Sequence, residues 1–164
     1  MSSGDFAELA QNSTREQFIE ACEFLFLVGS GSRGKVDQSD FADDHTFTKP
    51  AGAEPPRGGA PIVLAVRKVQ QMFPSMITIG RTSNNDLTLP STQISKFHAY
   101  FRLLGGRLEL GDAGSRNGTW VGPQRLEPKA APVPVKPGDR VRFGHFDFKL
   151  VDAGSCWDEL RRAG

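Results

Sequence analysis

Three short polar clusters in the second half of the chain carry the side chains that could do chemistry. They are Gly80-Arg81, Ser95-Lys96-Phe97-His98 and Ser115-Arg116-Asn117-Gly118-Thr119. The guanidinium of Arg81 stays charged at any relevant pH and presents a planar fork that can grip two oxygens of one anion. Ser95 adds a hydroxyl donor, and Asn117 adds an amide that both donates and accepts. Taken singly, each of these residues is better explained as a surface or turn residue.

The same clusters do not indicate a catalytic site. His98 has no serine, cysteine or carboxylate partner that the sequence places beside it, and there is no nucleotide loop or nucleophile elbow. The two cysteines, Cys22 and Cys156, form no CxxC pair and do not cluster with His45, His98 or His145. We therefore expect no enzyme activity, no catalytic residue, no metal and no cofactor.

Short strand-like segments separate the clusters and must position them. The runs 62–66, 76–79, 86–89, 99–103 and 107–110 are each typical of a half-buried strand. Segments 140–143 and 146–150 alternate polar and apolar residues and are joined by a Gly144-His145 turn. Because no helix-length pattern interrupts residues 61–152, the sequence predicts an antiparallel β-sandwich and excludes a nucleotide-binding α/β fold.

The N-terminal part of the chain predicts a helix and a linker. Ser13-Thr14-Arg15-Glu16 has the spacing of a capping box, and apolar residues recur after it at helical intervals, so we expect a helix from Thr14 to Leu27. Its apolar face is expected to pack on its own domain. Residues 29–60 are rich in Gly, Ser, Asp and Pro and are expected to form a flexible linker.

Charge is distributed unevenly along the chain. Residues 1–59 hold 5 Lys/Arg against 10 Asp/Glu, whereas residues 60–152 hold 13 against 7. The basic residues of the second segment are scattered without an aromatic platform, so nucleic-acid binding is not expected. The few cysteines, the acidic N-terminus and the shortness of the apolar run at 24–28 favour a cytoplasmic protein that neither enters nor crosses a membrane.

Taken together and in order, the motifs resemble those of the forkhead-associated (FHA) domain. The resemblance is carried by Ile79-Gly80-Arg81, Asn85-Asp86-Leu87, Ile94-Ser95-Lys96-Phe97-His98-Ala99, Leu110-Gly111-Asp112, Ser115-Arg116-Asn117-Gly118-Thr119-Trp120-Val121 and Pro137-Gly138-Asp139-Arg140-Val141. It implies an all-β fold: an FHA-type eleven-stranded antiparallel β-sandwich with an N-terminal helical extension and a short C-terminal helix. We expect the extension at 1–28, the linker at 29–60, the FHA domain at 61–152 and the terminal helix or tail at 153–164.

The resemblance also implies a role for each loop residue. Arg81, Ser95, Lys96, Arg116 and Asn117 are expected to bind a phosphopeptide, with Asn117 holding its main chain. Gly80, His98 and Gly118 are expected to support the site structurally. Lys96 stands where the family usually has an arginine, so it keeps the charge and loses the planar fork. Gln93 lies in a loop that the resemblance links to selectivity at the third residue after the phosphothreonine.

These expectations lead to one function and one alternative. The implied function is that of a non-catalytic phosphothreonine-peptide-binding adaptor, whose partners are a phosphothreonine-containing protein and a Ser/Thr kinase pathway. The alternative is a degenerate FHA fold that serves as a phosphate-independent interaction platform and docks through the helix near Phe18–Leu27. Thr46 and Thr48 stand in a partly acidic segment, and either one, if phosphorylated, would be a ligand for an FHA domain on another copy of the chain.

Overall fold

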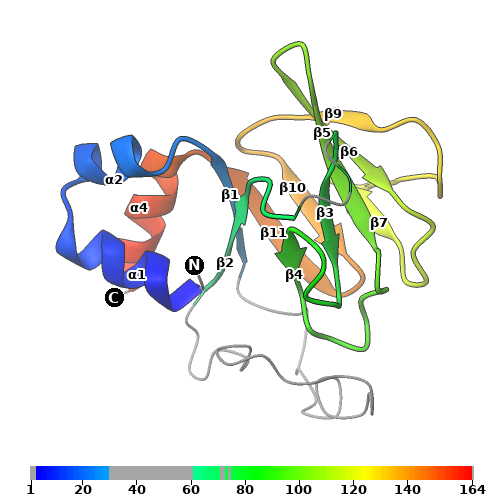
Figure 1. Ribbon diagram of the computed structural model, residues 1–164, viewed down its shortest axis with the longest axis horizontal. Helices are drawn as coiled ribbons and strands as arrows, with labels where there is room; N and C mark the ends of the chain where they lie inside the picture. Colours follow the sequence, from blue (N-terminus) through cyan, green and yellow to red (C-terminus); the bar gives the residue numbers. More distant parts are fainter. Residues whose placement is uncertain (1–2, 30–60, 71–72, 74, 164) are drawn as a thin grey trace.

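The computed structural model describes residues 3–29, 61–70, 73 and 75–163. In this part of the chain two β-sheets form a sandwich, and a group of helices lies at one side of it (Figure 1). Thr46, Thr48 and the expected linker after Gly29 lie outside the described residues.

Within the described ranges, eleven strands build the sandwich. They are β1 (Leu25–Gly29), β2 (Ile62–Val66), β3 (Ile77–Gly80), β4 (Leu87–Thr88), β5 (Ala99–Leu104), β6 (Arg107–Asp112), β7 (Thr119–Val121), β8 (Gln124–Arg125), β9 (Val133–Val135), β10 (Arg140–Phe143) and β11 (Phe146–Val151). One sheet has the order β2-β1-β11-β10-β7-β8, and the other has the order β4-β3-β5-β6-β9. The expected eleven-stranded β-sandwich is confirmed.

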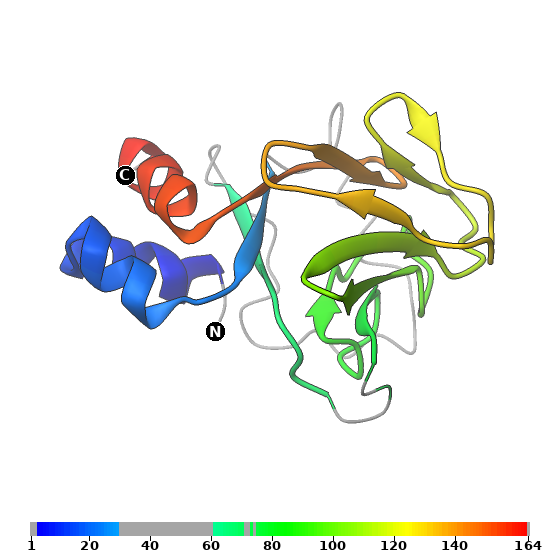
Figure 2. The same ribbon diagram turned by 90° about the horizontal axis from the view of Figure 1, so that it is seen from above.

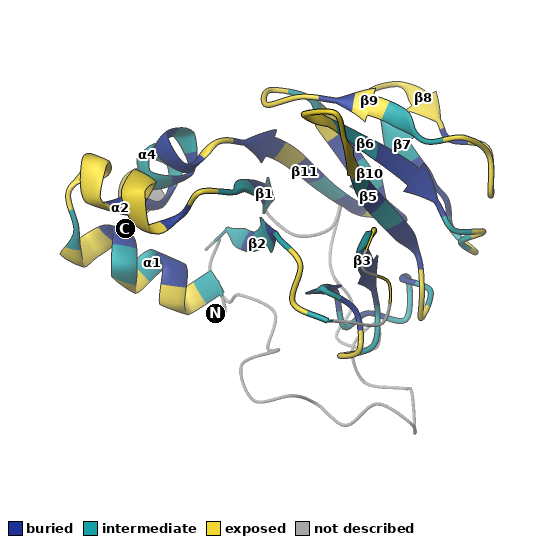
Figure 3. Cartoon of the chain, turned by 45° about the horizontal axis from the view of Figure 1, so that its top comes forward, coloured by how far each residue is buried: buried dark blue, intermediate teal, exposed yellow. Residues whose placement is uncertain are grey.

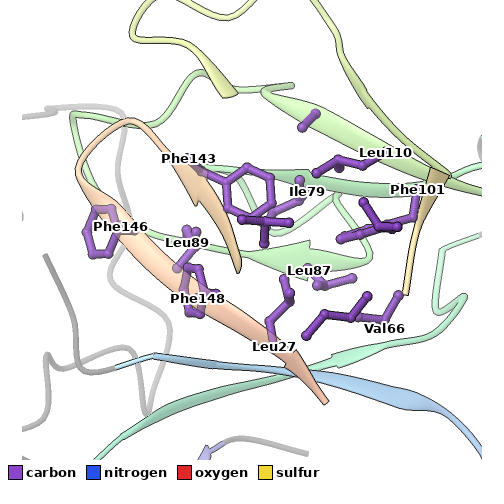
Figure 4. Packing of buried hydrophobic residues seen from close by; sticks show 14 of the residues in the cluster. Leu27, Val66, Ile79, Leu87, Leu89, Phe101, Leu110, Phe143, Phe146 and Phe148 are labelled. Atoms are coloured by element: carbon purple, nitrogen blue, oxygen red, sulfur yellow. The ribbon is translucent and has the colours of Figure 1, made fainter. Parts of the chain in front are cut away.

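The main core lies between the two sheets. Val141 and Phe143 of β10 pair with Phe148 and Phe146 of β11, and these four side chains are buried because alternate residues of a strand face the same side. Phe101 from the facing sheet is buried with them (Figure 4). Burying one such apolar side chain stabilises the fold by about 1.5–3 kcal/mol.

One pair of strands, β3 and β4, is parallel rather than antiparallel. The short connection between them returns beside β3 because the carboxylate of Asp86 anchors it. That carboxylate accepts hydrogen bonds from the backbone N–H groups of Thr78 at 2.8 Å, Val69 at 2.8 Å and Gln70 at 2.6 Å, and from the ammonium of Lys68 at 2.8 Å. Burial acts to raise the pKa of Asp86, but these hydrogen bonds outweigh it and lower the pKa.

The helix expected from Thr14 to Leu27 is wrong in its second half. Helix α2 covers Arg15–Ala21 and is followed by strand β1. The capping box lies one residue further along than expected: the Thr14 side chain accepts the Gln17 N–H, and the Gln17 side chain accepts the Thr14 N–H.

The reason is that β1 is buried on both faces. It lies between β2 and β11, with Phe26 packed toward the helices and Leu27 in the core of the sandwich. A strand buried on both faces appears in the sequence as a continuous apolar run, which periodicity cannot separate from a buried helix. The sandwich therefore includes residues 25–29, which precede the expected domain boundary at 61.

Three helices cover the outer face of the sheet near β1, β2 and β11 (Figures 2 and 3). Helices α1 (Ser3–Asn12) and α4 (Ala153–Ala163) join α2 there. A second hydrophobic core lies between these helices and the sheet. It contains Phe6, Phe18 and Phe26, together with the free thiols of Cys22 and Cys156. Burial raises the pKa of both thiols, that of Cys156 to about 12. None of the helices in the described ranges is both long and apolar enough to span a bilayer.

Candidate functional site

Three connections meet at one end of the sandwich: residues 81–86 after β3, residues 89–98 before β5, and residues 113–118 after β6. Ser95 is the point where they meet. The Arg81 backbone N–H donates to the Ser95 carbonyl at 2.9 Å, and the Arg116 backbone N–H donates to the Ser95 hydroxyl oxygen at 3.0 Å. The structure thus brings together residues that are 14 and 21 positions apart in the sequence, as the loop motifs predict.

These three loops carry three cationic side chains and a serine hydroxyl group. Arg81 and Ser95 are partly exposed, whereas Lys96 and Arg116 are exposed. Because the Ser95 hydroxyl accepts from Arg116, its own proton can donate to a ligand. A hydroxyl donor and three cationic residues on adjoining loops are groups that can bind an anion through charge-assisted hydrogen bonds.

Asn117 lies beside these residues and joins two of the loops. Its amide nitrogen donates to the Gln93 carbonyl at 2.8 Å and lies 3.3 Å from the Gln93 side-chain oxygen. The amide therefore holds the 89–98 loop in place. Its carbonyl oxygen is the group that suits an accepting contact to a peptide main chain.

His98 lies beneath the loops and is 0% exposed. Its Nδ1 accepts the Ser95 N–H at 3.1 Å, and its Nε2 lies 2.8 Å from the Gly118 carbonyl, to which it donates. Both ring nitrogens therefore hydrogen-bond to loop backbones, so His98 connects the loop of Ser95 to the loop of Gly118. Burial lowers the pKa of His98, opposed by the Gly118 carbonyl and the Asp112 carboxylate, so the folded protein keeps this ring neutral.

The lowered pKa of His98 predicts an acid-sensitive fold. The unfolded chain binds a proton at His98 as the pH falls below about 6.5, whereas the folded chain, with its lowered pKa, binds it only at a lower pH, so stability falls as the pH drops below about 7. The slope from one proton can reach about 1.4 kcal/mol per pH unit. Urea unfolding at several pH values measures this decline in stability.

The variant His98→Asn should be less stable than the wild type at pH 7.5, and its stability should decline less as the pH falls. The control variant His145→Asn, which changes an exposed histidine, should keep the decline of the wild type. Equal slopes in both variants would contradict the prediction.

Two glycines are required where the loops approach one another. A Cβ on Gly80 would lie 2.1 Å from the Lys96 carbonyl oxygen, which no side chain allows. Gly118 has a φ of +88°, and a Cβ there would lie 2.7 Å from the Trp120 ring. Gly80 thus lets the backbones of two loops contact each other directly, and Gly118 leaves room for the Trp120 ring.

Sequence reasoning gave no role to Asp112 and Asn85, which organise the loops from below. The Asp112 carboxylate accepts the N–H groups of Gly114 at 2.9 Å and Ser115 at 3.0 Å, and the hydroxyl groups of Ser115 and Thr119. Burial acts to raise the pKa of Asp112, but these hydrogen bonds lower it.

Asn85 is buried and does the same for a second loop. Its amide donates to the Lys96 carbonyl at 2.7 Å and to the Thr82 carbonyl at 3.0 Å. Asn85 and Asp112 both stand inside the recognised motifs, and the sequence signal for them was their polarity beside an apolar strand.

The described ranges contain no group of His, Cys, Asp or Glu residues arranged to hold a metal ion.

Comparisons with known proteins agree with this architecture. The family model of the FHA domain matches residues 77–144. The Corynebacterium glutamicum protein named oxoglutarate dehydrogenase inhibitor is 39% identical over 69 residues, which cover 42% of this chain and 46% of the relative. The glycogen accumulation regulator GarA of Mycolicibacterium smegmatis is 40% identical over 82 residues, 46% of this chain and 49% of the relative.

A solved structure shares the fold. The FHA domain of an Arabidopsis thaliana hypothetical protein aligns with a TM-score of 0.51 and 20% identity, over 79% of this chain and 85% of that chain. The matches to the two curated relatives span about half of each relative's length. The matched residues 77–144 contain all three loops, and the sandwich that carries them has the fold of that solved domain. The chain therefore contains a forkhead-associated domain.

Proposed function

We propose that the FHA domain of this chain binds a phosphothreonine-containing segment of a partner protein in a Ser/Thr kinase pathway, without catalysing a reaction. The observation that carries the proposal is the position of Ser95, which is hydrogen-bonded to the backbones of both Arg81 and Arg116. A phosphate dianion at this point would meet a hydroxyl donor and the guanidinium of Arg81 together. Lys96 and Arg116 supply further positive charge.

The proposal assigns each loop residue one task. Arg81 grips phosphate oxygens through its fork, Ser95 donates its hydroxyl, and Lys96 and Arg116 add charge. Asn117 offers its carbonyl oxygen to the main chain of the peptide while its amide stays bonded to Gln93. His98 holds the loops in place and takes no part in chemistry.

The direct test is calorimetry of the full chain against a degenerate mixture of phosphothreonine peptides and its unphosphorylated counterpart. Binding of the phosphorylated mixture alone is expected, since most of the contacts go to the phosphate. Equal binding of both mixtures, or of neither, would reject the proposal.

The pocket is expected to prefer phosphothreonine over phosphoserine, because the FHA resemblance implies that it encloses the additional methyl group. One buried methyl contributes about 0.8 kcal/mol, which is about a fourfold difference in affinity. Titration with paired peptides that differ only in this residue measures the ratio. A ratio of one would show that the methyl group stays in solvent.

The alternative, docking through the helix near Phe18–Leu27, is disfavoured by burial. Phe18, Phe26 and Leu27 are fully buried, and Cys22 is nearly so. These side chains, from helix α2, its C-cap and strand β1, already pack within the protein. They are not available to a partner without unfolding the helical cluster.

A further inference from the structure

Two phenylalanines form an exposed aromatic pair next to the candidate site. The rings of Phe73 and Phe97 lie 5.8 Å apart between centroids and are nearly parallel, with an interplanar angle of 9°. Phe73 is 40% exposed and Phe97 is 36% exposed. Single exposed apolar residues are common on protein surfaces, but two exposed rings in contact present a larger apolar surface than either ring alone. We call this pair the aromatic platform.

The platform is joined to the proposed phosphate site through the backbone. Phe97 belongs to the same loop as Ser95 and Lys96. On either side of Phe97 the backbone is fixed, because the Lys96 carbonyl accepts from Asn85 at 2.7 Å and the His98 N–H donates to the Ile79 carbonyl at 2.9 Å. Phe97 is therefore held in a set position relative to Ser95, as a specificity-determining side chain must be.

The order of contacts along this loop indicates on which side of Ser95 the aromatic platform lies. Along residues 93–97, Gln93 contacts Asn117, Ser95 contacts Arg81 and Arg116, and Phe97 stacks on Phe73. The platform and Asn117 thus lie at opposite ends of this stretch, with Ser95 between them. Two residues of backbone span at most about 7 Å, which is within reach of the first few residues of an extended peptide bound at Ser95.

We propose that the aromatic platform binds an apolar side chain of the phosphopeptide, one to three residues from the phosphothreonine and on the side away from Asn117. This inference rests on the proposed function. Covering the exposed apolar rings beside the proposed phosphate site with a ligand side chain stabilises the complex. Nearby positive charge on Lys96, Arg81 and Arg116 disfavours a basic residue there, so the platform selects an apolar residue rather than a cation.

The test is a binding screen of the full chain against an oriented library of phosphothreonine peptides, in which each flanking position is varied in turn. One flanking position is expected to favour Phe, Leu or Met over Ser and Lys by about three- to tenfold. Phe97→Ser and Phe73→Ser should each remove that preference while phosphate-dependent binding persists. Phe97→Leu should keep most of it.

The control variant is Leu103→Ser, which removes a 65% exposed apolar side chain from the β5–β6 hairpin, at the end of β5 away from His98. It should leave the preference unchanged. Phosphothreonine-dependent binding without a flanking apolar preference, or a preference that survives both Phe→Ser changes, would overturn the platform and leave the proposed function standing. Absence of phosphothreonine-dependent binding would overturn both.

Discussion

Arg81→Ala is expected to reduce phosphopeptide affinity by a few hundredfold or more while the protein stays folded. The arginine supplies charge-assisted hydrogen bonds to the phosphate, and their loss costs about 2–4 kcal/mol. Its backbone N–H, which donates to the Ser95 carbonyl at 2.9 Å, is kept by alanine, so this link between the two loops survives the change. Calorimetry gives the affinity, and urea unfolding of the same sample gives the stability.

Two further variants make this experiment specific. Arg81→Lys keeps the charge but loses the planar fork, so its affinity should lie between those of the wild type and the alanine variant. Arg107→Ala removes an exposed arginine at the tip of the β5–β6 hairpin, at the other end of the sheet. It should bind as the wild type does. Unchanged affinity in a folded Arg81→Ala protein would exclude the proposed phosphate site.

The sequence predicted the strands of the sandwich best where only one face of a strand is buried. Strands β10 and β11 alternate buried and more exposed residues along Arg140–Phe143 and much of Phe146–Val151, and this period is visible in the sequence. Strand β1 is apolar on both faces because helices cover its outer side. No local pattern identifies it, since the helices that bury Phe26 are brought there by tertiary packing.

The loops also combine features that the sequence predicts with features that only tertiary packing produces. The residues facing solvent at Arg81, Ser95 and Lys96 were predicted because their order and spacing resemble a family, and their geometry now supports a proposal. The aromatic platform was not predicted, although Phe97 stood within a quoted motif. Its partner Phe73 comes from the connection between β2 and β3, 24 residues earlier in the chain, and only the fold stacks the two rings.

The hydrogen bonds of Asp112 are the clearest example of contacts that the spacing of the motifs does not predict. Replacement of Asp112 is expected to have the largest effect on stability. The residue is 1% exposed, and its carboxylate accepts hydrogen bonds from two backbone N–H groups and two hydroxyl groups. Asp112→Ala removes the acceptor of all four donors, and one of them, the hydroxyl of Thr119, belongs to a fully buried residue. A single unsatisfied group costs about 1–3 kcal/mol, so we expect a loss of about 3–5 kcal/mol in the free energy of unfolding.

The same change should weaken ligand binding although Asp112 itself contacts no ligand. Its donors include Ser115, whose hydroxyl oxygen in turn accepts the Gly118 N–H at 3.0 Å, so the loop that carries Arg116 and Asn117 depends on it. Urea unfolding measures the stability, and titration with a phosphothreonine peptide below the unfolding range measures the affinity. Asp139→Ala is the control, because that carboxylate accepts the Lys136 N–H at 3.0 Å in an exposed turn and should cost about 1 kcal/mol or less.

The pH dependence separates the charge of Asp112 from its shape. Because hydrogen bonds lower its pKa in the folded state, the ionised carboxylate stabilises the protein above its usual value of 3.8, and this contribution is lost as the pH falls through the lower, folded value. Asp112→Asn keeps the size of the side chain and removes this titration. It should be less stable than the wild type at pH 7, and the difference should shrink below about pH 4. If Asp112→Ala instead unfolds within about 1 kcal/mol of the wild type and binds the peptide equally well, then the four hydrogen bonds do not position the loop, and the support of the site must come from His98 and Asn85 alone.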